Sequence, residues 1–235
     1  MQSLTEQLFK LAPPSGLFDK SVVASLFPKS SAAAKQNLIS RACAAGEVSI
    51  IRRGLYLLEP PFRQVGIDPI MLSSLIYGPS YISFESALRF YGLIPDIVQT
   101  VSAATSRRSC MFNTSVGYFT FTRVPVRSLL AGVRGIAMES GHRGVTTLMA
   151  SPARAIADLV YLRRDVCWDK VGFDFLEGSM RIEPEELWAQ LLKKDLEAVF
   201  DAYRNQRVRS FITGLMTGRS AALMTKQSRT RVVSE

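Results

Sequence analysis

The chain has 235 residues, of which 47% are hydrophobic and 21% charged, and it carries a formal net charge of +9. This length suits one large domain or two smaller ones, and the composition is that of a folded protein. No apolar stretch is long enough to cross a membrane and the first residues lack the layout of a signal peptide, so we expect a cytoplasmic protein with no membrane partner.

Two features of the composition bear on partners and cofactors. The positive charge indicates an anionic partner, or else a basic surface that serves only solubility. Residues 1–67 contain eight Lys and Arg against four Asp and Glu, so much of the excess lies near the N-terminus. The three cysteines, Cys43, Cys110 and Cys167, are far apart and odd in number, which fits neither a disulfide framework nor a zinc site.

Residues 1–60 are predicted to form three short helices followed by a hairpin. The first helix, within 3–12, stops at Pro13 and Pro14, and the second, within 18–27, is closed by Pro28. A third helix, within 31–46, is capped by Ser30 or Ser31 and ended by Gly46. Placing Leu38 at the centre of its buried face brings Ala34, Ala42 and Ala45 beside it at helical spacing.

The opposite face of this third helix is polar and uncluttered. It carries Gln36, Asn37 and Ser40, with Lys35 and Arg41 at its flanks. Gln and Asn can each form two hydrogen bonds with adenine in the major groove, while Lys and Arg can contact phosphates. The face therefore fits a helix that enters the major groove of DNA.

The stretch EVSIIRRGLYLLEP, residues 47–60, reads as a hairpin whose tip holds Arg52, Arg53 and Gly54. Gly54 lets the turn adopt a positive φ, and the two arginines can reach phosphates or the minor groove. Three helices and a two-stranded hairpin are the layout of a winged helix-turn-helix. A plain solvated turn is the alternative explanation of the arginines, and winged helices also mediate protein contacts.

The rest of the chain is predicted to be a larger domain that mixes helices and strands. Residues 61–67 are the predicted linker, 68–218 the second domain, and 219–235 a basic tail whose last dozen residues are mobile. Strands are expected within 96–105 and 116–124, with a polar hairpin connection at 106–115. A helix is expected at 151–162, with Ser151 as its cap and Pro152 at its first position, and further helices close the domain. The predicted fold class is therefore α+β.

Several stretches of the second domain resemble a known family. YISFESALRFYGLIPD, TSRRS, FNTSVGYFTF and SPARAIADLVYL, in this order after RRGLYLLEP, are similar to the AbiEi-type antitoxins of bacterial abortive-infection, or type IV toxin–antitoxin, systems. The resemblance covers roughly residues 1–215. It implies a winged helix that binds the promoter of its own operon, and a C-terminal domain that counteracts a nucleotidyltransferase toxin without binding it stably. Lys35, Gln36, Asn37, Ser40 and Arg41 would then belong to the recognition helix, and Arg52 and Arg53 to the wing.

No arrangement of residues predicts catalysis, a metal site or a cofactor. The only histidine, His142, lies in a glycine-flanked loop without a second histidine or a paired carboxylate nearby. No lysine has Asp or Glu two residues before it, as a restriction-type nuclease would need, and no phosphate-binding glycine loop is present. Asp158, among apolar residues, is expected to cap a helix or to pair internally. We therefore expect a protein that is not an enzyme.

Two questions stay open at the level of sequence. Arg107 and Arg108 in TSRRS could contact a nucleic acid or an acidic partner, or could lie on a solvated loop. The main alternative function is a protein-interaction module that uses its winged helix for assembly and has no specific DNA site. The sequence does not distinguish a monomer from a protein that assembles cooperatively on DNA.

Overall fold

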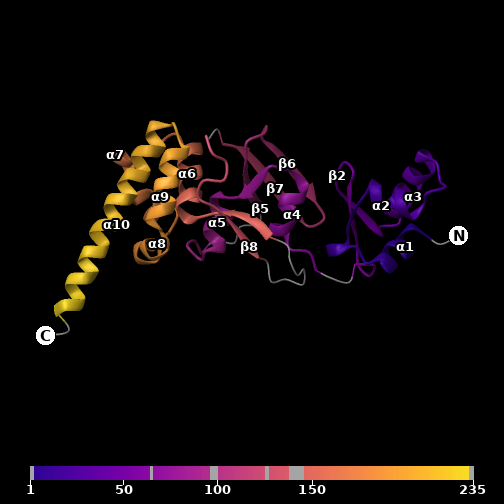
Figure 1. Cartoon of the computed structure of the whole chain (residues 1–235), viewed down its shortest axis with the longest axis horizontal. Helices are drawn as coiled ribbons and strands as arrows, with labels where there is room; N and C mark the ends of the chain where they lie inside the picture. The colour runs from indigo at the N-terminus through magenta and orange to yellow at the C-terminus, as the bar shows by residue number, and fades with distance from the viewer. Residues whose placement is uncertain (1–2, 64–65, 96–99, 125–126, 138–145, 233–235) are drawn as a thin grey trace.

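The computed structural model describes residues 3–63, 66–95, 100–124, 127–137 and 146–232. Helices and strands are mixed along the chain, which confirms the predicted α+β class. Figure 1 shows an elongated molecule, with the N-terminal helices at one end, a large sheet in the middle, and a helical layer at the other end.

The first unit contains three helices and a small antiparallel sheet. The helices are α1 (Leu4–Leu11), α2 (Lys20–Leu26) and α3 (Ala32–Ala44), and the strands β1 (Leu17–Asp19), β2 (Val48–Arg52) and β3 (Leu55–Leu58) pair in the order β1-β3-β2. Ser3, Asp19 and Ser31 accept hydrogen bonds from the first backbone N–H groups of α1, α2 and α3, so each helix begins at a side-chain cap. Strand β1 was not predicted, because two of its three residues, Phe18 and Asp19, were assigned to the start of the second helix.

The buried face of α3 differs from the prediction. Ile39 and Ala42 are its buried residues, whereas Leu38 is only partly buried and Ala34 and Ala45 are exposed. Successive residues of an α-helix are about 100° apart around its axis. The buried face, centred on Ile39 and Ala42, is therefore rotated about the helix axis relative to the predicted face, which was centred on Leu38. The large apolar side chain of Ile39, rather than a line of alanines, fills the space against the core that also contains Leu8 and Phe18.

The second unit contains a six-stranded mixed sheet in the order β6-β7-β5-β4-β9-β8. Its strands are β4 (Ser80–Ile82), β5 (Thr100–Thr105), β6 (Cys110–Thr114), β7 (Gly117–Arg123), β8 (Val133–Ala137) and β9 (Thr146–Ala150). Strand β6 corrects the prediction of a polar connection at 106–115. The strand has only five residues, Cys110–Thr114. Phe112 packs against the core on one face of the sheet, while Met111 is exposed.

Seven α-helices and a short π-helical segment (Phe175–Ser179) accompany this sheet in the described part of the chain. The α-helices are α4 (Pro69–Ile76), α5 (Phe84–Phe90), α6 (Pro152–Leu162), α7 (Trp168–Val171), α8 (Pro184–Gln190), α9 (Lys193–Ala202) and α10 (Gln206–Val232). Helix α6 confirms the prediction, with Ser151 as its cap and Pro152 in its first turn. The further helices expected to close the domain include α9, which ends at Ala202, and α10, at whose start Asn205 accepts a hydrogen bond from the Val208 N–H.

Helix α10 continues past Gly218, where the sequence predicted the helical region to end. Residues 219–232 contain no Gly or Pro and include good helix formers such as Ala221, Ala222 and Leu223, which favours continuation. Figure 1 shows this C-terminal part of α10 extending beyond the rest of the molecule.

Strand β3 of the hairpin is covered on both of its faces. Tyr56 and Leu58 of β3 pack with the helices of the first unit, whereas Ile51 and Leu57 pack with Leu72, Ile76, Phe119 and Phe121 of the second unit. Alternate residues of a strand point to opposite faces, so the unbroken apolar run at 55–58 suits a strand covered on both sides. In Figure 1, β2 lies on the side of the first unit that faces β6 and β7, and α3 lies on the far side.

Candidate nucleic-acid interface

A groove of about 590 Å³ lies between α3 and the β2–β3 hairpin. Its walls come from both elements and from the first residue of α2. The lining residues are Lys20, Gln36, Ile39, Ser40, Cys43, Ile50, Arg53, Gly54 and Tyr56. The hairpin turn beside it holds Gly54 at a φ of 83°, a conformation that residues with a side chain rarely adopt. The turn thereby places Arg53 at the mouth of the groove.

The structure brings three of the predicted DNA-binding residues together in this groove. Gln36 and Ser40 of α3 and Arg53 of the hairpin tip all line it, and all three are exposed. Asn37 and Arg41 are exposed on the same helix but do not line the groove. The predicted polar face of α3 is thus accessible, and its Gln36 edge faces the hairpin.

Lys35 lies on a different side of α3 from these residues. At about 100° per residue it falls between Ile39 and Ala42, the two buried residues of the helix, and it is partly buried itself. A lysine can cover apolar surface with its methylene chain while its ammonium group stays in water. Its position is therefore that of a residue at the rim of the core rather than at the groove.

Arg52 points to the second unit rather than into the groove. Its Nε donates to the carbonyl oxygen of Leu75 at 3.4 Å, and one terminal nitrogen donates to the carbonyl oxygen of Arg53 at 3.2 Å. Leu75 is in the last turn of α4, where backbone carbonyls lack partners within the helix and carry partial negative charge. Arg52 therefore ties the hairpin tip to the C-terminal end of α4.

The groove is basic and contains no carboxylate. Among the described residues, none of the cations Lys20, Arg41, Arg52 or Arg53 forms an ion pair, although Arg63, Arg134 and Arg163 do so elsewhere. Lys20 and Arg53, which line the groove, therefore remain available for an anion from outside.

Two groups of the groove have shifted acidities. Burial raises the pKa of the Tyr56 hydroxyl, the neighbouring Cys43 adds to the increase, and a hydrogen bond with Gln36 opposes it. Burial also raises the pKa of the Cys43 thiol. Both groups are therefore neutral near pH 7, and the charge of the groove comes from its cations.

Sequence reasoning missed Lys20, Ile50 and Tyr56 as lining residues. Lys20 belongs to the first turn of α2 and meets α3 only through the tertiary fold, so no local pattern indicates it. Ile50 is 58% exposed although it lies within a strand. The available signal was that Ile50 and Ile51 are consecutive residues of a strand. Neighbouring strand residues face opposite sides, so only one of the two could face the core.

Arg107 and Arg108 lie in the exposed loop between β5 and β6. The terminal nitrogen Nη1 of Arg107 donates to the carbonyl oxygen of Gly78 at 3.1 Å, and its guanidinium lies 4.8 Å from the centre of the Tyr77 ring. The Tyr77 hydroxyl donates to the carbonyl oxygen of Arg108 at 3.0 Å. The loop is thus held against the end of α4, and the Arg108 side chain remains exposed.

The core of the second unit contains a buried ion pair. Arg154 and Asp158 of α6 are fully buried, with Nε and Oδ1 2.9 Å apart, which confirms the internal pairing expected for Asp158. Tyr81, Ser83 and Tyr203 donate their hydroxyl hydrogens to the Asp158 carboxylate. Burial and the charge of Asp158 raise the pKa of both tyrosines well above its usual range. Because the network is buried and its hydrogen bonds are satisfied, we assign it a role in the stability of the fold.

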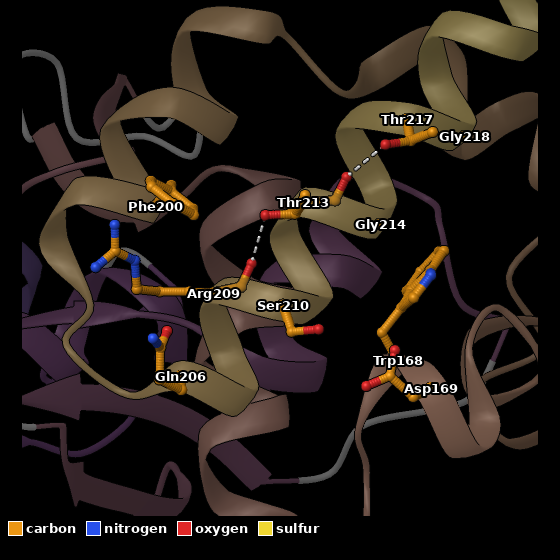
Figure 2. A pocket seen from close by; sticks show the side chains of 10 residues that line it. All are labelled: Trp168, Asp169, Phe200, Gln206, Arg209, Ser210, Thr213, Gly214, Thr217 and Gly218. Atoms are coloured by element: carbon orange, nitrogen blue, oxygen red, sulfur yellow. Dashed lines mark hydrogen bonds between the residues drawn. The ribbon is translucent and has the colours of Figure 1, made fainter.

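A second and larger pocket, of about 1030 Å³, lies along α10. Figure 2 shows Phe200 and Arg209 on one side of the helix and Trp168 on the other. The Arg209 guanidinium lies 4.1 Å from the centre of the Phe200 ring. A Cβ atom at Gly214 would lie 2.1 Å from two ring atoms of Trp168, so the indole packs directly on the helix backbone. No pair of groups in this pocket suits acid–base or nucleophilic chemistry.

No protein-family model matches the chain, and no curated protein matches it. Within the described residues, no group of three or more His, Cys, Asp and Glu side chains could hold a metal ion, and His142 lies outside them. A search of the same residues for a helix of membrane-spanning length and hydrophobicity finds none.

Proposed function

We propose that the first unit is a winged helix that binds duplex DNA, and that the protein is an autorepressor that doubles as an antitoxin. The order of elements, α1-β1-α2-α3-β2-β3, with α3 preceding a hairpin, supports the winged helix. In this proposal α3 enters the major groove and the hairpin tip lies on the adjacent backbone.

One observation carries the proposal: Gln36 and Ser40 of α3 and Arg53 of the hairpin line the same exposed, carboxylate-free groove. A side-chain amide can read a base edge, and an arginine beside it can hold the neighbouring phosphate. Lys20, on the same groove, supplies a second cation for the backbone. Arg52, which is engaged with Leu75, acts by holding the tip in place.

The test is a titration of the full chain with a labelled duplex taken from immediately upstream of its own coding sequence. A scrambled duplex of equal composition is the comparison. Arg53→Ala is expected to lower the slope of log affinity against log salt by about 0.9, since one phosphate contact is lost. Gln36→Ala is expected to reduce discrimination at one base pair by about 1–3 kcal/mol and to leave the salt slope unchanged.

Lys194→Ala is the matched control, because it removes an exposed cation from α9 in the other unit. It is expected to behave as the unmodified protein does. If Arg53→Ala also kept the full affinity and slope, the groove would not be the DNA site.

The exposed Ile50 favours a second candidate, a protein-interaction module without a specific DNA site. An isoleucine that is 58% exposed at the groove offers apolar contact to a protein partner and nothing specific to a phosphate. Equal affinity for the upstream and scrambled duplexes would favour this candidate over the repressor.

The antitoxin role is supported by the resemblance of the second unit to AbiEi-type proteins, through stretches such as SPARAIADLVYL. It is tested by co-expression with a nucleotidyltransferase encoded beside the gene. Relief of growth arrest by the full chain is the expected result, and unrelieved arrest would contradict the antitoxin role.

A further inference from the structure

Tyr56 lies where the hairpin meets α3. It is only 4% exposed, yet it lines the groove together with Gln36 and Ser40 of α3. Its hydroxyl forms a hydrogen bond with the side chain of Gln36, which is exposed. A buried phenol of the hairpin is thus joined to the side chain that the proposed function assigns to base recognition.

The neighbours of Tyr56 hold its ring in place. In the small sheet Tyr56 lies opposite Phe18 of β1 and Ile50 of β2, and its ring stacks on that of Phe18 at a centroid distance of 5.4 Å. A buried ring among close-packed neighbours has few alternative rotamers. The hydroxyl is therefore a fixed point in the groove, against which the exposed Gln36 side chain is oriented.

The hydrogen bond with Tyr56 is compatible with the recognition of adenine. A glutamine amide has two N–H donors and a carbonyl oxygen with two lone pairs. Adenine presents the N7 acceptor and the N6 donor in the major groove, so pairing with it uses one N–H and one lone pair of the amide. Tyr56 occupies one of the remaining sites, whichever of the two groups donates. Gln36 can therefore contact Tyr56 and adenine at the same time.

We propose that Tyr56 is a positioning residue, which holds the Gln36 amide in the orientation that pairs with adenine and rejects guanine. This inference rests on the proposed function and names the base that the site selects. Guanine presents two acceptors, N7 and O6, so a fixed amide brings its carbonyl oxygen against one of them. An amide that rotates freely can instead turn its N–H groups toward guanine.

A purely structural role explains this hydrogen bond less well. The bond contributes little to folding, because an exposed amide such as that of Gln36 can bond to water instead. What the bond does fix is the direction of the amide. Fixing that direction before DNA binds reduces the entropy lost on binding.

The experiment uses the full chain and the upstream duplex. Gln36→Ala first identifies the base pair at which discrimination is lost, and the purine of that pair is then varied between adenine and guanine. The unmodified protein is expected to prefer adenine by about 5- to 160-fold. Tyr56→Phe, which keeps the ring, is expected to reduce this preference by about 2- to 12-fold, the contribution of one hydrogen bond. The salt slope and the thermal midpoint are expected to stay unchanged.

Two further variants separate positioning from a general effect. In the Gln36→Ala background, Tyr56→Phe is expected to have no further effect on the preference, since both residues act through one contact. Tyr118→Phe removes a phenol that is 56% exposed in β7 of the second unit, and it is the matched control. It is expected to keep the preference of the unmodified protein.

The outcomes distinguish this inference from the proposed function. If Tyr56→Phe keeps the preference while Gln36→Ala loses it, Tyr56 does not position the amide and the DNA assignment of the groove stands. The inference also falls if Tyr56→Phe weakens binding to both duplexes equally, if guanine is the preferred purine, or if Gln36→Ala loses discrimination at no base pair. If the unmodified protein does not distinguish the upstream duplex from the scrambled one, the proposed function falls together with this inference.

Discussion

At the scale of single residues, the most demanding feature is the buried pair of Arg154 and Asp158. Removing two charges from water costs free energy, which is recovered only when every donor and acceptor is satisfied. Arg154 donates to Asp158 and to the carbonyl oxygen of Ala131 at 2.8 Å, and three hydroxyl groups complete the shell of the carboxylate. The apolar residues around Asp158 predicted that it caps a helix or pairs internally, but they did not indicate Tyr81 and Tyr203, which lie far away along the chain.

We expect Asp158→Asn to lower the free energy of unfolding by about 3–5 kcal/mol, because it leaves the Arg154 cation buried without a counter-charge. Urea unfolding followed by circular dichroism measures the change. Asp201→Asn, on the exposed side of α9, is the control and is expected to have little effect. A loss of under about 1 kcal/mol for Asp158→Asn would mean that water reaches the guanidinium.

At the scale of elements, what could be predicted depended on how local the determining interactions are. The helices within 3–12 and 151–162 were predicted because caps, prolines and periodicity lie within the segment itself. Strand β6 was missed because its polar residues resemble a turn, although its partner β7 follows directly in the chain. Strand β1 was missed because it has three residues and is fixed by β3, which lies far along the chain. The buried face of α3 was misplaced for the same reason, since only the tertiary core selects Ile39.

Helix α10 contains two glycines at positions where tryptophan rings pack against its backbone. Gly214 costs about 1 kcal/mol relative to alanine in a helix, yet its missing side chain admits the Trp168 ring. Gly218, one turn later, meets Trp188 in the same way, with a Cβ–ring distance of 2.9 Å. The two glycines therefore serve packing against two tryptophans.

We expect Gly214→Ala to lower the free energy of unfolding by about 1–3 kcal/mol, against its helix propensity, because the added methyl group displaces Trp168. Ser210→Ala, one turn earlier, is the control for propensity alone. Combining Gly214→Ala with Trp168→Ala should cost less than the sum of the two single changes, since the clash disappears. Additive losses in urea unfolding would show that the contact is not the cause.

At the scale of the whole molecule, the two units are joined through the hairpin that also forms one wall of the candidate site. Ile51 and Leu57 share a core with Leu72 and Phe119, and the Ser49 and Ser115 hydroxyls lie 2.9 Å apart across the contact. The unbroken apolar run GLYLL was a sequence signal for a strand covered on both faces, but only the structure identifies the second cover. The candidate groove therefore depends on both units for its shape.

This shared core leads to a prediction about cooperativity. Leu72 of α4 is fully buried in it and lies outside the groove. We expect the unmodified chain to unfold in a single transition. Tryptophan fluorescence reports on Trp168 and Trp188 in the second unit, and circular dichroism reports on both units. The two signals should therefore change at the same urea concentration. Leu72→Ala removes buried methyl groups at a cost of about 2–5 kcal/mol.

The variant is expected to separate the two transitions, with the first unit unfolding at lower urea because its hairpin loses the cover on one face. It should also weaken the proposed DNA binding, although no groove residue has changed, since Arg53 is then less firmly placed. Leu176→Ala, buried in the core around α6 and away from the hairpin, destabilises the second unit and is the matched comparison. If both variants kept coincident transitions and equal DNA affinity, the hairpin would be held by the first unit alone.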